Sequence, residues 1–261
     1  MCLLFFAYDC HPRYRLVVAA NRDEFYNRPT LPAAFWQDSP KTLAGRDLEH
    51  GGTWMGITKT GRFAALTNYR DPFYIRPHAA SRGLIIPEYL NSDSSPESFI
   101  KNLCNGGAEY KGFSLLLGTT KSLYYYSNRE QAFRQVVKGI HGISNNLLDV
   151  PWPKVAKGMD SLARCLQDQE IKKEQLFEIM ADQEPADDHE LPQTGESLEW
   201  ERILSPAFIV SPDYGTRSTT VVLVDRNGHI WFWERSYKAG QLRVSGEVFY
   251  EFDVEESDPH Y

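Results

Sequence analysis

The pattern of apolar and polar positions at the start of the chain predicts a buried β-hairpin. Residues 3–7 and 16–20 form two short apolar runs, and His11-Pro12 lies in the turn between them. Short apolar runs bounded by turn residues are typical of strands that are buried on both faces. The second run leads directly into the polar tetrad Asn21-Arg22-Asp23-Glu24. Antiparallel pairing would therefore place residue 2 beside this tetrad.

Further strands are expected wherever β-branched and aromatic residues form runs between turn signals. These runs cover residues 53–58, 63–68, 113–117, 123–126, 133–137, 140–145, 207–210, 216–224, 230–237 and 244–254. Helical spacing of apolar positions predicts helices at 81–90, 96–104, 153–167 and 172–180. Residues 27–40 have the composition of a surface connection, and the acidic segment 184–199 is either a lid or a solvated loop.

The order of these elements predicts an α+β fold. Two helical blocks lie among three groups of strands, which fits two stacked, mainly antiparallel sheets flanked by helices. The strands between residues 113 and 145 are expected to form one meander. A chain of 261 residues, 42% of them hydrophobic, can bury one sizeable core, and its composition shows no break. We therefore expect a single domain that spans residues 1–261.

The net charge restricts the class of partner that is expected, and the cysteines indicate the cellular compartment. The net charge of −7 argues against nucleic acid and against an anionic membrane surface, because both require clustered Lys and Arg. A small molecule or a protein is the expected partner, and the oligomeric state is left open. The four cysteines have neither paired spacing nor a Cys-x-x-Cys motif, so we expect no metal site, no disulfide framework and a cytoplasmic location. The apolar run 3–7 is too short for a signal peptide or a membrane span.

Cys2 is the first candidate for chemistry. If Met1 is removed, Cys2 carries both a thiol and a free α-amine, and such an amine titrates at about 7.7 to 8.0. The thiolate is a competent nucleophile and the amine can serve as its base, so one residue could supply both groups. The alternative is that Cys2 is a small apolar residue that opens a core strand, because free cysteine is among the most buried residue types.

Polar residues at three other strand ends are further candidates. Asn68 follows an apolar strand, where an amide could donate a hydrogen bond to a developing oxyanion, and Asn145 follows another strand with a polar side chain at its exit. Each could instead satisfy its own turn or cap a helix. Arg217 begins a later strand, where it could steady a thiolate, bind a substrate carboxylate or form a surface ion pair.

Six motifs in fixed order resemble one known family. They are Asn21-Arg22-Asp23-Glu24, Gly52-Thr53-Trp54, Leu66-Thr67-Asn68-Tyr69-Arg70, Gly142-Ile143-Ser144-Asn145, Pro151-Trp152-Pro153-Lys154 and Thr216-Arg217-Ser218-Thr219-Thr220. Together they resemble the Asn-Arg-Asp-Glu family, which is named for transport and Golgi organisation protein 2. The resemblance covers about residues 1–224. That family is similar to a branch of the N-terminal nucleophile hydrolases, related to choloylglycine hydrolases and acid ceramidase.

The resemblance implies a four-layer αββα fold and a role for each motif residue. Cys2 would be the nucleophile and Asp23 would orient its amine, while Asn68 and Asn145 would hold the oxyanion and Arg217 would support the site. The side chains expected to contact the substrate are Arg22, Trp54, Tyr69 and Arg70. No cofactor is required by this reading, and the reaction would cleave an amide or acyl bond of an apolar small molecule.

The resemblance also implies a second reading from a different class, a non-catalytic carrier. The family's described role is the handling of intracellular haem or acyl lipid, so haem or an acyl-CoA would be a cargo ligand. The loop 69–80 mixes aromatic and basic residues that could contact such a ligand, namely Arg70, Phe73, Tyr74, Arg76 and His78. One departure favours this reading: related hydrolases have an Arg three residues before the aspartate, and here that residue is Ala20. Strand alternation should point Arg22 away from Asp23.

Overall fold

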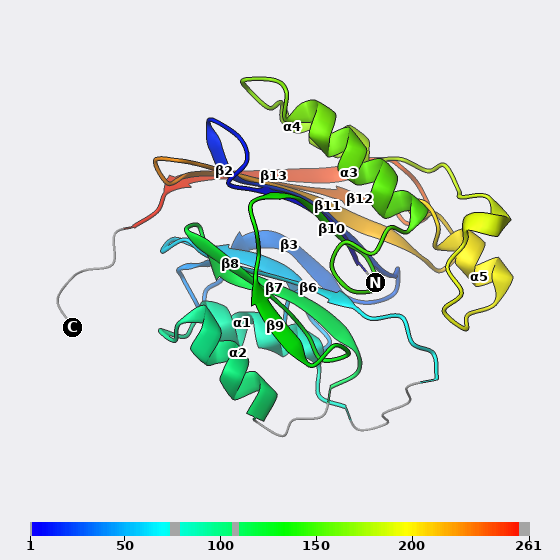
Figure 1. Ribbon diagram of the computed structural model, residues 1–261, viewed down its shortest axis with the longest axis horizontal. Coiled ribbons are helices and arrows are strands. Elements are labelled where there is room, and N and C mark those ends of the chain that lie inside the picture. Colours follow the sequence, from blue (N-terminus) through cyan, green and yellow to red (C-terminus); the bar gives the residue numbers. More distant parts are fainter. Residues whose placement is uncertain (1, 74–78, 106–109, 256–261) are drawn as a thin grey trace.

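Two antiparallel sheets are stacked face to face, with helices on both outer sides (Figure 1). The computed structural model describes residues 2–73, 79–105 and 110–255, and for Cys2 it describes the main chain only. Helices α3 and α4 cover one sheet, and α1 and α2 cover the other. These four layers confirm the predicted α+β sandwich.

The first sheet has six strands in the order β10-β1-β2-β11-β12-β13. Their bounds are β1 Cys2–Tyr8, β2 Tyr14–Phe25, β10 Gly139–Ile143, β11 Tyr214–Asp225, β12 His229–Tyr237 and β13 Val244–Asp253. The second sheet has seven strands in sequence order from β3 to β9. Their bounds are β3 Thr30–Phe35, β4 Thr42–Asp47, β5 Met55–Thr58, β6 Arg62–Asn68, β7 Phe113–Thr119, β8 Ser122–Ser127 and β9 Ala132–Gln135.

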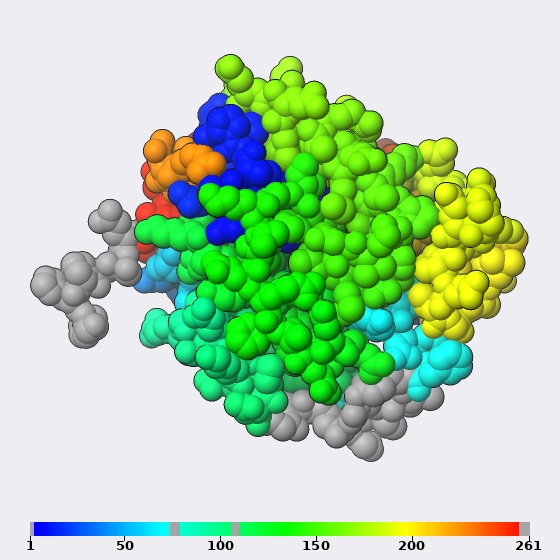
Figure 2. Space-filling model, viewed as in Figure 1, coloured from blue at the N-terminus to red at the C-terminus, as the bar shows by residue number. Residues whose placement is uncertain are grey.

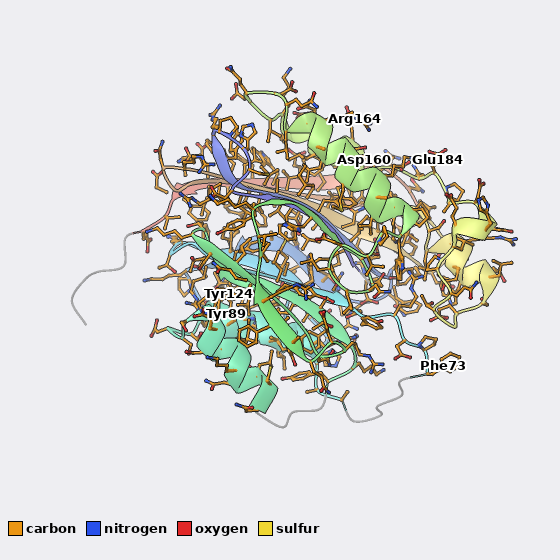
Figure 3. All side chains as sticks on the ribbon, viewed as in Figure 1. Phe73, Tyr89, Tyr124, Asp160, Arg164 and Glu184 are labelled. Carbon is orange, nitrogen blue, oxygen red and sulfur yellow. The ribbon has the colours of Figure 1, made fainter. Side chains whose placement is uncertain are left out.

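The α-helices are short and amphipathic, so packing on the sheets supplies most of their stability. Their bounds are α1 Ile85–Leu90, α2 Pro96–Asn105, α3 Pro153–Cys165, α4 Lys173–Met180 and α5 Leu198–Ile203, with 3-10 turns at Arg82–Leu84 and Asp188–Glu190. On α3, Asp160 and Arg164 point outward, away from the sheet (Figure 3). In the described part of the chain, no helix is both long enough and apolar enough to cross a membrane.

The predicted hairpin of β1 and β2 lies at the centre of the first sheet. Alternate residues of these strands face opposite layers. Leu4 and Phe6 enter the core between the two sheets, whereas Leu3 and Phe5 pack against α3 and α4. The register pairs Cys2 with Arg22. The expectation that residue 2 lies beside the end of the second strand is therefore confirmed.

A third core lies between the second sheet and helices α1 and α2. Tyr89 of α1 is completely buried there, and its hydroxyl donates a hydrogen bond of 2.8 Å to the carbonyl oxygen of Gly118. Tyr124 lies nearby, at the same side of the sheet (Figure 3). These contacts fix α1 and α2 on the outer face of the second sheet.

Two expectations about the second sheet were wrong. Residues 27–40 were expected to be a surface connection, but they contain β3, and β4 was not expected at all. Pro32 lies within β3, and proline in a run argues against a strand unless that strand is at an edge. Strand β3 is an edge strand, and Pro32 lies in the irregularity between Leu31 and Ala34 where pairing with β4 is interrupted, so its missing N–H costs no ladder hydrogen bond.

Three further expectations about individual segments also differ from the structure. Strands β7, β8 and β9 form a meander, but β10 leaves it and pairs with β1 in the other sheet. Residues 207–210 form no strand beyond a bridge between Val210 and Gly215. The segment 184–199, expected to be irregular, ends in the first turn of α5. Alternation of apolar residues predicts strands but does not say which sheet a strand joins.

Candidate functional site

The polar end of β2 is buried, although three successive polar residues form it. Asn21, Arg22 and Asp23 are each at most 5% exposed. Asn21 faces the helix layer, where its Nδ2 donates to the carbonyl oxygens of Met180 at 2.8 Å and Ala207 at 2.9 Å. A buried amide is tolerated only when its hydrogen bonds are made, and Asn21 makes them. It thereby fastens the end of β2 to the segment that follows α5.

Asp23 lies on the same face as Asn21 and is held by two residues of β11. The Oγ1 of Thr216 donates to the Asp23 carboxylate at 2.7 Å, and the Tyr214 hydroxyl donates to its carbonyl oxygen at 3.1 Å. Burial raises the pKa of Asp23, while the charge of the amino terminus, Lys154 and the Thr216 hydrogen bond act in the opposite direction. Asp23 is thus a desolvated carboxyl that depends on neighbouring cations and donors to ionise.

One of those cations, Lys154, was not predicted as a site residue. It lies in the first turn of α3, and its Nζ donates to the carbonyl oxygens of Leu204 at 2.7 Å and Pro206 at 3.4 Å. Burial lowers the pKa of Lys154 to about 8, and Asp23 opposes that shift. A buried ammonium beside a buried carboxylate stabilises the ionised form of each. The only sequence signal for this role was its place in the Pro-Trp-Pro-Lys motif.

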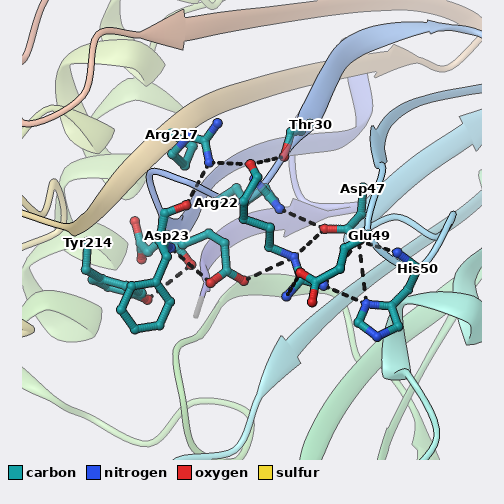
Figure 4. Close-up of polar contacts among 11 residues, drawn as sticks. Arg22, Asp23, Thr30, Asp47, Glu49, His50, Tyr214 and Arg217 are labelled. Atoms are coloured by element: carbon teal, nitrogen blue, oxygen red, sulfur yellow. Dashed lines mark hydrogen bonds and ion pairs between the residues drawn. The ribbon is translucent and has the colours of Figure 1, made fainter.

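Arg22 points from β2 toward the second sheet. Its guanidinium lies 4.3 Å from the centre of the Trp54 ring, and its Nη2 donates to Asp47 at 3.3 Å (Figure 4). Asp47 also accepts from Arg28 at 2.5 Å and from the main-chain N–H of His50 at 3.0 Å. Stacking on an aromatic ring and pairing with a carboxylate suit a planar guanidinium. Asp47 therefore joins the two sheets at the site, a role that the sequence did not indicate.

Arg22 and Asp23 point to opposite faces of β2, as expected, yet both line one cavity. We call this the polar cavity; its volume is about 310 Å³. The strand ends here, so the cavity reaches both of its faces. Its lining residues are Arg22, Asp23, Glu24, Arg28, Asp47, His50, Gly52, Thr53, Trp54, Leu66, Asn68, Ala79, Ala80, Ser81, Arg82, Gly83 and Lys111. Ala20 shares the face of Arg22 and packs in the core between the sheets.

The two predicted oxyanion donors occupy different positions. Asn68 ends β6 and lines the polar cavity. Asn145 is buried behind it, and among the described residues it does not belong to the cavity lining. Its Nδ2 donates to the carbonyl oxygen of Asn68 at 2.9 Å, and its own carbonyl accepts from the N–H of Arg70 at 2.8 Å. The structure thus brings the two residues together with Asn68 in front.

Arg70 and Tyr69 turn away from the polar cavity. The Arg70 guanidinium is buried, forms an ion pair with Glu201 of α5 and lies 4.8 Å from the centre of the Trp152 ring. Tyr69 packs beneath Arg129, whose guanidinium is 5.6 Å from the ring centre. Figure 2 shows the segment after β6, in cyan, next to the α5 region, in yellow. Of the other basic and aromatic residues of this loop, Phe73 is exposed, whereas Tyr74, Arg76 and His78 lie outside the described residues.

Arg217 lies at a β-bulge where β11 pairs with β2. Its Nη1 donates to the carbonyl oxygens of Phe25 at 2.8 Å and Arg28 at 2.9 Å (Figure 4). Burial and the nearby Arg22 lower its pKa. These bonds hold the turn that follows the polar tetrad, and they place Arg217 at the back of the site.

For Cys2 the structure fixes the position of the main chain. Cys2 pairs with Arg22, whose side chain and that of the next residue, Asp23, line the polar cavity. Its thiol and Met1 lie outside the described residues. The other three cysteines are free thiols far from this position in sequence or fold: Cys10 and Cys104 are exposed, and Cys165 is buried in α3.

The fold and the placement of the first strand define the class of protein: this is an N-terminal nucleophile hydrolase fold. Similar solved structures are a mutant conjugated bile acid hydrolase from Clostridium perfringens and a Caenorhabditis elegans ortholog of N-acylethanolamine-hydrolyzing acid amidase. The first has a TM-score of 0.53 and 9% identity and covers 99% of this chain and 94% of its own. The second has a TM-score of 0.50 and 9% identity, with coverages of 85% and 92%. Identity this low shows the fold alone.

The family is shown by sequence. The chain belongs to the Transport and Golgi organisation 2 family, whose model matches residues 1–239. The human Transport and Golgi organization protein 2 homolog is 35% identical over 276 residues, covering 98% of this chain and all of that protein. The mouse homolog is 36% identical over 257 residues, covering 90% of this chain and 93% of that protein. The resemblance drawn from the six motifs is confirmed.

Proposed function

We propose that the protein is an acyl hydrolase of the N-terminal nucleophile type that cleaves an amide or thioester bond of an apolar small molecule. One observation carries this proposal: the pairing of β1 with β2 sets the main chain of Cys2 opposite Arg22, and Arg22 and its buried neighbour Asp23 both line the polar cavity. Removal of Met1 would leave a thiol and an α-amine at that point. The three described thiols are unpaired, which fits a reducing, cytoplasmic location.

The reaction follows from the chemistry of an N-terminal cysteine. The α-amine takes the thiol proton, the sulfur attacks the substrate carbonyl, and the proton then passes to the leaving nitrogen as the carbon–nitrogen bond breaks. Water attacks the resulting thioester and returns the enzyme to its free form. Asp23 orients the amine, and the amide of Asn68 donates to the oxyanion from the cavity wall. No step requires a cofactor.

Two predicted catalytic residues receive supporting roles in this proposal. Asn145 holds the carbonyl of Asn68, so it positions the donor in front of it. Arg217 holds the turn after β2 through two carbonyl oxygens. Arg22 and Trp54 form the cavity wall, whereas Arg70 and Tyr69 brace the loop behind Asn68.

The test is a screen of N-acyl amides and thioesters with the wild-type protein and with Cys2→Ala. Product from wild type and none from Cys2→Ala is the expected result, since the substitution removes only the nucleophile. Intact mass spectrometry of both proteins establishes whether Met1 is absent. Equal turnover by the two proteins would overturn the proposal.

A second candidate is a carrier that binds haem or an acyl-CoA without turnover. It is favoured by the basic residues that line the polar cavity beside Trp54, namely Arg22, Arg28, Arg82 and Lys111, and by Ala20 at the position where related hydrolases have Arg. Both ligands combine an apolar body with anionic groups. Titration with each, followed by absorbance or calorimetry, should saturate near one equivalent if this reading holds. Absence of saturation with both would exclude it.

A further inference from the structure

A second cavity opens next to the polar cavity, on the side of α5. Its volume is about 210 Å³, and we call it the apolar cavity. It is lined mostly by apolar groups, from Glu24, Phe25, Asn68, Glu196, Trp200, Leu204 and Tyr214. Glu24 and Asn68 line both cavities. The two therefore meet at Asn68, the residue proposed to hold the oxyanion.

The walls of the apolar cavity are preformed. The ring of Tyr214 packs edge to face against Phe25 at 5.2 Å and against Trp200 at 5.9 Å. The Tyr214 hydroxyl is fixed by its hydrogen bond of 3.1 Å to the carbonyl oxygen of Asp23. Such aromatic pairs hold their geometry through both packing and ring electrostatics. The cavity is thus attached to the residue proposed to orient the nucleophile.

Volume and charge indicate what this cavity takes. An engineered apolar cavity of about 150 Å³ binds one benzene molecule, so a cavity of about 210 Å³ has room for about eight carbon atoms. The carboxylates of Glu24 and Glu196 would repel an anionic group here. The polar cavity also contains carboxylates, and Glu24 is shared by both cavities, but among the described residues only the polar cavity is lined by basic side chains that can bind an anionic group, namely Arg22, Arg28, Arg82 and Lys111. A ligand with an apolar end and an anionic end can therefore enter in one orientation only.

We propose that the apolar cavity binds the acyl group of the substrate, with about eight carbon atoms, and that Trp200 sets this length. The inference rests on the proposed function, because the acyl carbonyl is placed at Asn68, where the two cavities meet. The rest of the substrate is the amine part of the amide, which carries a carboxylate as in an amino acid, and it occupies the polar cavity. Trp200 lines this cavity from α5 and has the largest side chain of the lining, so its indole is the group expected to limit how far the chain extends.

The experiment uses the Cys2→Ala protein, which binds without turnover, and a series of N-acylglycines with 2 to 14 acyl carbons, followed by calorimetry. Each added CH2 should raise affinity about three- to fourfold, because burying one is worth about 0.8 kcal/mol. The rise should stop at about eight carbons. Affinity that does not depend on chain length, or that keeps rising to 14 carbons, would overturn the inference.

Substitutions in the cavity lining test whether Trp200 sets the acyl length at which affinity stops rising. Trp200→Ala should move the end of the rise to longer chains, and Trp200→Phe should move it less. If Trp200→Ala does not fold, Phe25→Ala tests the opposite wall, since Phe25 is 50% exposed. Trp233→Ala is the matched control, because Trp233 stacks on Phe249 of β13 rather than lining either cavity. An equal change in Trp233→Ala and Trp200→Ala would contradict the assignment.

The outcome separates this inference from the proposed function. Chain-length dependence in the binding series without turnover by wild type would retain the apolar cavity as an acyl site and reject hydrolysis. Turnover by wild type with no chain-length dependence in binding would retain hydrolysis and reject the acyl site.

Discussion

The side-chain amide of Asn145 donates a hydrogen bond of 2.9 Å to the main-chain carbonyl oxygen of Asn68. Asn68 ends β6 of one sheet and Asn145 lies two residues after β10 of the other, so the bond ties the sheets together at the site. Asn68 lines both cavities, whereas Asn145 is buried behind it. The pair therefore consists of one residue that can reach a ligand and one that fixes its position.

Asn145→Ala should lower both stability and turnover. The carbonyl of Asn68 would lose its donor in a partly buried position, which costs about 1 kcal/mol in the free energy of unfolding. Turnover should fall because the amide of Asn68 is no longer held against the cavity. Urea unfolding and substrate assays check the two effects. Asn102→Ala, on the exposed side of α2, is the control, and an equal loss there would reject the role of Asn145.

Cys2 should be the most reactive thiol once Met1 is removed. Burial raises the pKa of Cys165, and partial desolvation raises that of Cys10 although its side chain is exposed, so both remain largely protonated near neutral pH. Competitive labelling with iodoacetamide across pH, read by peptide mass spectrometry, should show Cys2 modified first. Retention of Met1 in the mature protein, or a rate at Cys2 no higher than at Cys10, would count against the hydrolase.

The sequence predicted the site residues that lie close together along the chain, but not those brought in from other layers. Cys2 and Asp23 lie on one hairpin, so two apolar runs and a turn were enough to bring them together. Asp47 lies in β4, a strand that the sequence pattern did not predict. Lys154 reaches the site from α3, a helix in a different layer. Local patterns carry no information on such contacts, because the packing of the layers decides them.

The motif residues also show why a role cannot be assigned from position alone. Asn68 and Arg70 are two residues apart in one motif, yet Asn68 lines the cavities and Arg70 pairs with Glu201. Both asparagine and arginine side chains could line a cavity or form a buried polar contact, so the residue types did not distinguish the two roles. Only the position of α5, which the sequence did not predict in this region, decides between them.

His141 should make the protein more stable at acidic than at alkaline pH. Both ring nitrogens face acceptors, the carboxylate of Asp149 at 2.8 Å and the carbonyl oxygen of Val137 at 3.0 Å, which favours the imidazolium. Burial acts to lower the pKa of His141, but these hydrogen bonds outweigh it and raise the pKa above 6.5.

The sign follows from proton linkage. A group with a raised pKa in the folded state contributes its full stability below its unfolded pKa of about 6.5, and that stability is lost as pH rises through the folded pKa. Urea midpoints between pH 5 and 9 should therefore fall less with pH in His141→Gln than in wild type. His189→Gln, at an exposed position, should behave like wild type. Identical pH slopes for wild type and His141→Gln would contradict this assignment.

Lys154→Met should shift the pH dependence of the proposed reaction as well as reduce stability. The ammonium favours ionisation of Asp23, whose pKa burial already raises, so its removal should raise the Asp23 pKa further. The acidic limb of the rate profile should then move to higher pH. The carbonyl oxygens of Leu204 and Pro206 would also lose a donor, at a cost of about 1–3 kcal/mol in unfolding free energy.

Lys157→Met is the matched control for this substitution. Lys157 lies one turn further along α3, where its ammonium is exposed and pairs with Asp182 at 2.6 Å. Exposed ion pairs contribute about 0–1 kcal/mol, so this variant should lose little stability and keep the wild-type rate profile. The two variants remove the same charge from the same helix, which excludes net charge as the cause of any difference. If Lys154→Met lost stability with an unchanged acidic limb, Lys154 would support the fold without acting on Asp23.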